Sequence, residues 1–173
     1  MKSHHITPSA LERELAEGEY IVSTTTPSGR ITSVNDVLVA YSGYSRTELL
    51  GSQHNILRHP DMPRAVFWLA WDTLQAGEDF MGYIKNMSKD GGYYWVFSQI
   101  QPEYDKDGEV IGYRSVRRQP RRSAVAAASA LYAEMLAAEQ AVETRDAIAA
   151  GLAVLRRHLG AQGQSYEQMV AAL

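Results

Sequence analysis

Four side chains suited to binding a polar ligand lie within eight positions of one another: His54, Arg58, His59 and Asp61. A guanidinium such as that of Arg58 is well shaped to hold a phosphate or pyrophosphate through paired hydrogen bonds. The competing interpretation is a local ion pair and cap between Arg58 and Asp61. Two prolines flank Asp61, so the sequence predicts a loop or a single helical turn around this cluster.

Two aromatic side chains, Phe67 and Trp71, follow the polar cluster. They lie in the stretch 64–76, whose apolar spacing predicts a helix. Residues four apart share one face of a helix, so both rings can wall the same pocket. The alternative is that they are ordinary core residues, which is the common role of aromatics at helical spacing.

Polar residues on three predicted strands complete the set: Asn86, Ser98 and Arg117. Strand alternation puts Ser98 on the same face as Val96 and Ile100. An inward Arg117 would be costly unless it faced an anion. Each of these residues also has a purely structural interpretation. Asn86 would be an amide that satisfies a strand edge, Ser98 a filled core position and Arg117 a solvated cation.

The composition argues against several classes of protein. Without cysteine the chain has no disulfides, thiolate catalysis or cysteine zinc sites. It has no catalytic triad, phosphate loop or metal-ligand spacing, so we expect no enzyme. The net charge of -3 gives no reason to expect nucleic acid. No apolar run approaches the roughly 18 residues of a membrane span, so we expect a cytoplasmic protein.

Turn and cap signals divide the first 120 residues into short elements. The predicted strands cover residues 20–26, 30–34, 80–88, 93–103 and 109–118. Helical stretches between the second and third strands begin at the caps Asn35 and Ser45, and the helix 64–76 follows them. This order predicts an α+β fold, with a five-stranded antiparallel sheet and short helices on one face that leave a cavity.

The chain changes character near residue 123, where it becomes rich in alanine and helically periodic. We expect three parts: an N-terminal helical cap at 1–19, a sensor domain at 20–120 and a helical output or docking segment at 121–173. The cap is predicted from Thr7 followed by Pro8. The last segment either packs on the domain or docks a partner, and the sequence leaves both open.

Several motifs resemble the flavin-binding PAS domain of bacterial aerotaxis receptors. Asn35-Asp36 and Ser42-Gly43-Tyr44 are general to PAS domains, whereas the string His-Asn-x-x-Arg-His-Pro-Asp-Met-Pro at 54–63 is specific to the aerotaxis type. The stretch Asn-x-x-Lys-Asp-Gly, from Asn86 to Gly91, is similar to flavin-binding light sensors. The resemblance covers residues 25–118. It implies a PAS fold. Because the sequence begins with Met1 and contains no membrane anchor, we expect the stand-alone PAS protein of a bipartite energy-taxis system; the alternative is a receptor cut before its anchor.

The resemblance also implies a cofactor, FAD, with FMN and haem as less favoured alternatives. It implies that Asn86 hydrogen-bonds the pyrimidine edge of the flavin and that Arg117 stands where light sensors have a glutamine. It places His54 at the position of their adduct-forming cysteine, which excludes that photochemistry. The remaining cofactor contacts that we expect from the resemblance or the pocket are Asn35, Arg58, His59, Asp61, Phe67, Trp71 and Ser98.

These expectations combine into a redox or oxygen sensor that signals by protein contact. Its expected partner is a membrane-bound chemotaxis transducer or the HAMP and signalling region of one. A homodimer is a further expectation, because PAS domains often pair through an N-terminal helix and the sheet face. Two alternatives stay open: a haem-binding gas sensor, with His59 as ligand, and an interaction module without cofactor.

Overall fold

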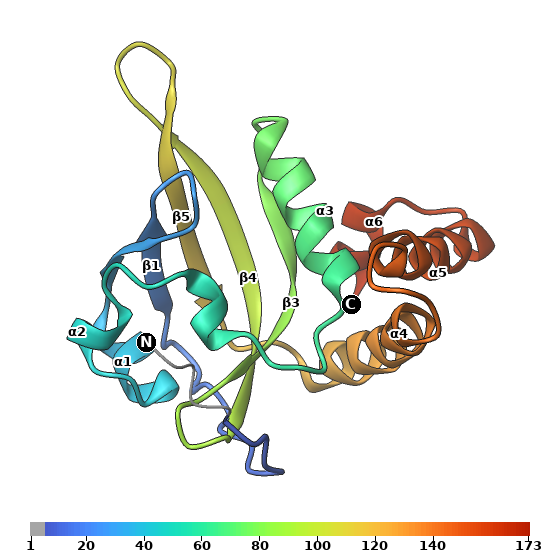
Figure 1. Ribbon diagram of the computed structural model, residues 1–173, viewed down its shortest axis with the longest axis horizontal. Coiled ribbons are helices and arrows are strands. Elements are labelled where there is room, and N and C mark those ends of the chain that lie inside the picture. Colours follow the sequence, from blue (N-terminus) through green and yellow to red (C-terminus); the bar gives the residue numbers. More distant parts are fainter. Residues whose placement is uncertain (1–5) are drawn as a thin grey trace.

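A five-stranded antiparallel sheet forms the centre of the computed structural model, which describes residues 6–173 (Figure 1). Its strand order is β2-β1-β5-β4-β3. The strands are β1 (Ile21–Thr25), β2 (Ile31–Val34), β3 (Phe80–Met87), β4 (Tyr93–Tyr104) and β5 (Val110–Arg118). Glycines with positive φ, Gly29, Gly91 and Gly108, lie in the three turns that join sequential neighbours. The predicted fold class is confirmed.

Short helices cover one face of this sheet. They are α1 (Asp36–Ser42), α2 (Arg46–Leu49), the 3₁₀ helix η1 (His54–Leu57) and α3 (Arg64–Gln75). The predicted caps are present: the side chain of Asn35 accepts from the amide of Leu38, and Ser45 forms a capping box with Glu48. The single turn predicted for the polar cluster is η1.

The predicted helix after Thr7 is wrong: residues 6–19 contain no helix, and residues 1–5 of the expected cap lie outside the described part. The segment is extended, and Glu12 forms a parallel bridge with Tyr93. The amide of Tyr93 donates to the carbonyl of Leu11 at 2.9 Å. β5 pairs with β4 only from Phe97 onward, so the start of β4 has a free edge that this segment occupies. A local cap signal could not show that edge.

Three helices follow the sheet: α4 (Arg122–Gln140), α5 (Ala147–Gln162) and α6 (Tyr166–Ala172). They pack on the sheet and α3 instead of extending away (Figure 1). The ring of Tyr132 stacks 6.2 Å from Trp95, and its hydroxyl donates to the carbonyl of Tyr83 at 2.8 Å. Trp95 alternates with inward residues of β4, so α4 contacts the opposite face of the sheet, on the β3 side. Tyr166 of α6 stacks on Phe80 at 5.9 Å.

None of the helices within residues 6–173 combines the length and the apolarity needed to cross a membrane. The same residues contain no cluster of three potential metal ligands from histidine, cysteine, aspartate and glutamate.

A glycine pair tests the extended N-terminal segment. Gly91 and Gly51 both have positive φ, near 89° and 80°, but a Cβ on Gly91 would overlap the carbonyl oxygen of Thr7, whereas Gly51 faces open space. Left-handed strain costs each alanine variant about 1–2 kcal/mol. We expect Gly91→Ala to lose more free energy of unfolding than Gly51→Ala, by about 1 kcal/mol or more. Chemical denaturation measures both, and equal losses would contradict the packing of this segment.

Candidate functional site

A cavity of about 330 Å³ lies between the inner face of the sheet, η1 and α3. Seven of the ten predicted site residues line it: His54, Arg58, Phe67, Trp71, Asn86, Ser98 and Arg117. The cavity is mostly apolar on the side of α3 and polar toward the middle strands. This size and lining are typical of a small-molecule site.

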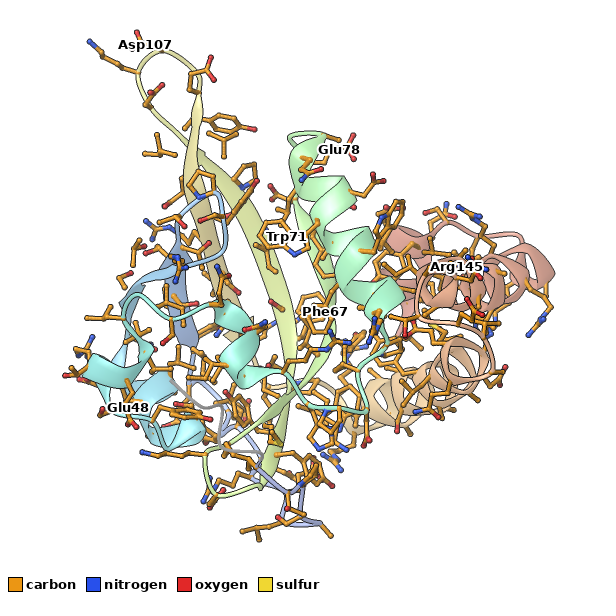
Figure 2. All side chains as sticks on the ribbon, in the orientation of Figure 1. Glu48, Phe67, Trp71, Glu78, Asp107 and Arg145 are labelled. Carbon is orange, nitrogen blue, oxygen red and sulfur yellow. The ribbon has the colours of Figure 1, made fainter. Side chains whose placement is uncertain are left out.

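One face of α3 forms the apolar wall. Phe67 and Trp71 both line the cavity, as their spacing predicts, and Figure 2 shows them on the side of the helix that faces the sheet. Trp71 lies edge-on to Tyr113 of β5, with ring centroids 5.4 Å apart. The guanidinium of Arg58 lies 4.8 Å from the centre of the Phe67 ring. The wall therefore offers aromatic surface with a cation beside it.

The polar side of the cavity is built around Arg117. This residue is only 2% exposed. Its Nε donates to Oγ of Ser115 at 2.9 Å, and one terminal nitrogen, Nη2, donates to Oγ of Ser23 at 2.5 Å. Oγ of Ser115 lies 3.2 Å from Oγ of Ser98. The other terminal nitrogen, Nη1, is buried without a partner among the described residues.

The charge of Arg117 has no counter-ion within residues 6–173, where no carboxylate forms an ion pair with it. Burial lowers the pKa of Arg117 to about 10, so the group is still protonated at neutral pH. A buried cation that is solvated only by neutral acceptors costs several kcal/mol. An anionic or electron-rich group in the cavity would offset that cost.

His54 contacts the guanidinium of Arg117, as Ser23 and Ser115 do. Its Nε2 lies 2.9 Å from Nη2 of Arg117. A guanidinium can only donate, so Nε2 is the acceptor and the proton of the neutral ring is on Nδ1. Burial and the charge of Arg117 lower the pKa of His54 to about 3. The imidazole therefore stays neutral over the whole physiological range.

Asn86 lies on β3, where its side chain lines the cavity and is 4% exposed. The backbone of Asn86 forms an isolated antiparallel bridge with Arg58. This bridge ties the loop after η1 to the edge strand, so an amide and a guanidinium from distant segments lie beside each other. Val96, on the same face of β4 as Ser98, is fully buried and is not part of the lining.

Three predicted residues, Asn35, His59 and Asp61, are not brought to the cavity. Asn35 joins α1 to β1: its Oδ1 accepts from the amides of Leu38 and Val22, both at 3.1 Å. Asn35 therefore caps α1 and also anchors β1, whereas the prediction for this residue was a cofactor contact.

His59 and Asp61 form a separate cluster. Nδ1 of the buried His59 accepts from the amide of Asp61 at 3.1 Å, while its Nε2 has no partner among the described residues. The pKa of His59 is lowered by burial and then by Lys85. The carboxylate of Asp61 pairs with Lys85 at 2.6 Å, so the alternative ion pair between Arg58 and Asp61 is wrong. Arg58 donates instead to the carbonyl of Met62 at 3.0 Å.

The sequence reasoning missed several polar and aromatic residues of the site. Ser115 and Tyr113 line the cavity on β5, and strand alternation from Arg117 would have found both. Ser23 could not be found this way, because it reaches Arg117 only through the pairing of β1 with β5. Asn55, beside His54, also lines the cavity.

Comparison with known proteins gives a family match. The family model described as PAS fold matches residues 31–117, about half of the chain. A light-oxygen-voltage domain from a study with a flavin analogue superposes with a TM-score of 0.56 at 24% identity, covering 62% of this chain and 81% of that one. At this identity the superposition bears on the fold alone.

Two curated relatives extend the comparison. The aerotaxis receptor of Escherichia coli (strain K12) is 39% identical over 146 residues, which cover 84% of this chain and 28% of that protein. The alignment therefore includes part of the helical segment after the family match. The nitrogen fixation regulatory protein of Klebsiella pneumoniae is 30% identical over 97 residues, or 56% of this chain and 20% of that protein. The chain spans less than a third of the length of either relative.

The lowered pKa of His54 makes a prediction about acid stability. The unfolded chain binds a proton at His54 below about pH 6.5, whereas the folded protein binds it only near pH 3. The unfolded state holds more protons in this window, so the free energy of unfolding falls as the pH drops. In His54→Gln the amide oxygen can still accept from Arg117, but the linkage is gone. We expect a shallower slope between about pH 6 and 4, by up to about 1.4 kcal/mol per pH unit.

Denaturation of the ligand-free protein at several pH values measures this slope. Asn55→Gln, at the neighbouring cavity position, is the matched control and should keep the wild-type slope. A His54→Gln protein with the wild-type slope would show that His54 is protonated in the folded state.

Proposed function

The chain belongs to the PAS fold family, and we propose that it is a redox sensor of energy taxis that binds a flavin in the cavity. In this proposal it signals by protein contact to a membrane-bound chemotaxis transducer, from the cytoplasmic side. The observation that carries the proposal is the buried Arg117, whose charge has no counter-ion and whose Nη1 has no partner among the described residues. Similarity to the aerotaxis receptor supports the signalling context.

The residues present fit a flavin ring. Phe67 and Trp71 offer apolar surface for a planar heterocycle, and Asn86 offers both a donor and an acceptor for its pyrimidine edge. When bound, a flavin supplies reversible reduction, which adds negative charge to the ring system. Arg117 stabilises the more negative state by its charge, and the neutral His54 leaves that charge undiminished.

We propose FAD ahead of FMN as the flavin. A cavity of about 330 Å³ suits the ring system and leaves the rest of a dinucleotide to run outside it. Arg58 lines both this cavity and a second, open hollow bordered by Arg64, Glu139 and Gln140. A pyrophosphate that leaves the cavity would pass Arg58, whose guanidinium can bind it through two hydrogen bonds.

Haem has less support from the site. A haem needs an axial ligand to its iron, and the ligand expected from the sequence is a histidine nitrogen. The expected ligand, His59, lies outside the cavity lining, and Nε2 of His54 accepts from Arg117. An interaction module without cofactor would leave the cost of burying Arg117 without an offsetting function.

The position of Arg117 near the end of β5 suggests a route for the signal. α4 begins at Arg122, five residues after Arg117. Shifting a two-state segment from about 10% to 90% active takes about 2.6 kcal/mol of differential interaction. One hydrogen bond to a charged group contributes about 1.5–3 kcal/mol. One or two hydrogen bonds remade at Arg117 are therefore enough, without a large motion.

A visible absorption spectrum of the purified protein tests the cofactor. We expect the two-banded spectrum of an oxidised flavin, and reconstitution with FAD should restore it where flavin was lost. Asn86→Ala should bind FAD at least about tenfold more weakly, because a buried amide that pairs with the ring is removed. Gln99→Ala, which removes an amide from the opposite face of the neighbouring strand β4, is the control. A Soret band, or no FAD uptake by the wild type, would refute the flavin assignment.

The charge of Arg117 predicts the reduction potential. In Arg117→Gln the more negative, reduced state loses its cation, so we expect the midpoint potential to fall by about 30 mV for each tenfold loss of relative affinity. Arg118→Gln is the matched control, because the neighbouring guanidinium stacks on Phe97 and is exposed. Redox titration of the FAD-loaded proteins measures both. An unchanged potential in Arg117→Gln would contradict the proposed role.

A further inference from the structure

Helix α3 begins without a cap of its own. Its N-cap residue is Pro63, which forms no side-chain hydrogen bond to the first turn. The first amides of a helix have no partner within the helix, so they need acceptors from elsewhere. In α3 the amides concerned are those of Arg64 and Ala65, directly before Val66 and Phe67, which line the cavity.

A carboxylate from the C-terminal segment supplies the missing cap. Glu139, near the end of α4, is only 5% exposed. Its Oε2 accepts from the amide of Arg64 and its Oε1 from the amide of Ala65, both at 2.9 Å. The residues are 75 and 74 positions apart, so the contact exists only while α4 is docked. Both oxygens also lie at the partially positive end of the helix dipole.

Helix α5 is adapted to the same contact. A Cβ on Gly151 would lie 2.5 Å from Oε1 of Glu139 and 2.8 Å from Cβ of Ala65. Any side chain here would displace the carboxylate from the amides. Three helices therefore meet at one buried carboxylate, and two of them belong to the C-terminal segment.

A buried carboxylate gives this contact two distinct states. While α4 is docked, Glu139 and the first turn of α3 satisfy each other. If they separate slightly, both remain out of water without partners, which is costly. The contact is therefore either made or fully opened to solvent, and it does not stretch gradually.

We propose that Glu139 is a positioning residue that couples the C-terminal segment to the cavity by holding the first turn of α3. The aromatic wall carried by α3 then takes its binding geometry only while α4 and α5 are docked. Coupling of this kind is reciprocal: a ligand that orders the wall stabilises docking of the segment to the same extent. The identity of the ligand rests on the proposed function, but the coupling does not.

Hydrogen exchange with and without FAD tests the coupling in the full chain. In Glu139→Gln one carboxylate oxygen becomes an amide nitrogen that faces an N–H donor. We expect the first turn of α3 and the amides of α5 to exchange at least about tenfold faster in this variant, and FAD to bind about tenfold more weakly. In the wild type FAD should slow exchange in α4 and α5, and in the variant this slowing should be lost.

Two further variants separate coupling from simple loss of stability. Glu134→Gln changes an exposed glutamate of the same helix and should behave as the wild type in both measurements. Gly151→Ala keeps the carboxylate but pushes it from the amides, and should reproduce the Glu139→Gln pattern. If Glu139→Gln binds FAD as the wild type does and FAD still slows exchange in α4 and α5, the coupling is refuted.

Whether the protein binds FAD is judged separately from whether Glu139 couples the C-terminal segment to α3. If the wild type takes up no FAD, the proposed function fails while the coupling is judged from exchange in the free protein. In that case Glu139→Gln must still release α3 and α5 together, and exchange as in Glu134→Gln would overturn the inference.

Discussion

A guanidinium buried without a carboxylate is the constraint that organises the centre of this molecule. Arg117 needs acceptors from several directions, and they come from three separate elements: Ser115 on its own strand, Ser23 on β1 and His54 on η1. Serines therefore occupy inward positions on the middle strands where apolar residues would pack better. The arrangement holds β1, β5 and η1 together around the guanidinium of Arg117, whose Nη1 has no hydrogen-bond partner among the described residues.

Most of the fold could be predicted because its signals are local. Turn glycines, the caps Asn35 and Ser45, and the apolar spacing of α3 each act within a few residues. The N-terminal segment could not be predicted, since its conformation depends on how far β5 extends along β4. The same holds for the C-terminal helices, whose existence follows from periodicity but whose docking depends on contacts such as Tyr132 with Trp95.

The residues of the site divide in the same way, into those that local patterns predict and those whose contacts depend on how distant elements pack. Phe67 and Trp71 reach the cavity because helical spacing decides their direction, and Ser98 and Arg117 because strand alternation does. The cluster around Asp61 was harder, because which cation pairs with it depends on the position of β3, which carries Lys85. Glu139 carried no sequence signal at all: a glutamate in an alanine-rich helix looks like any solvated residue until α3 is placed against it.

Helix α4 lies against the outer face of the sheet on the β3 side, where Tyr132 packs on Trp95. The sheet face is also the surface through which two copies were expected to pair. A second protein, whether another copy or a different partner, can reach Trp95 and the β3 side of that face only after this helix has left it. The helix is tethered by a linker of a few residues, which corresponds to a local concentration in the millimolar range. Association through this part of the sheet would compete with an internal occupant, so it would depend on the partner's concentration relative to that local concentration.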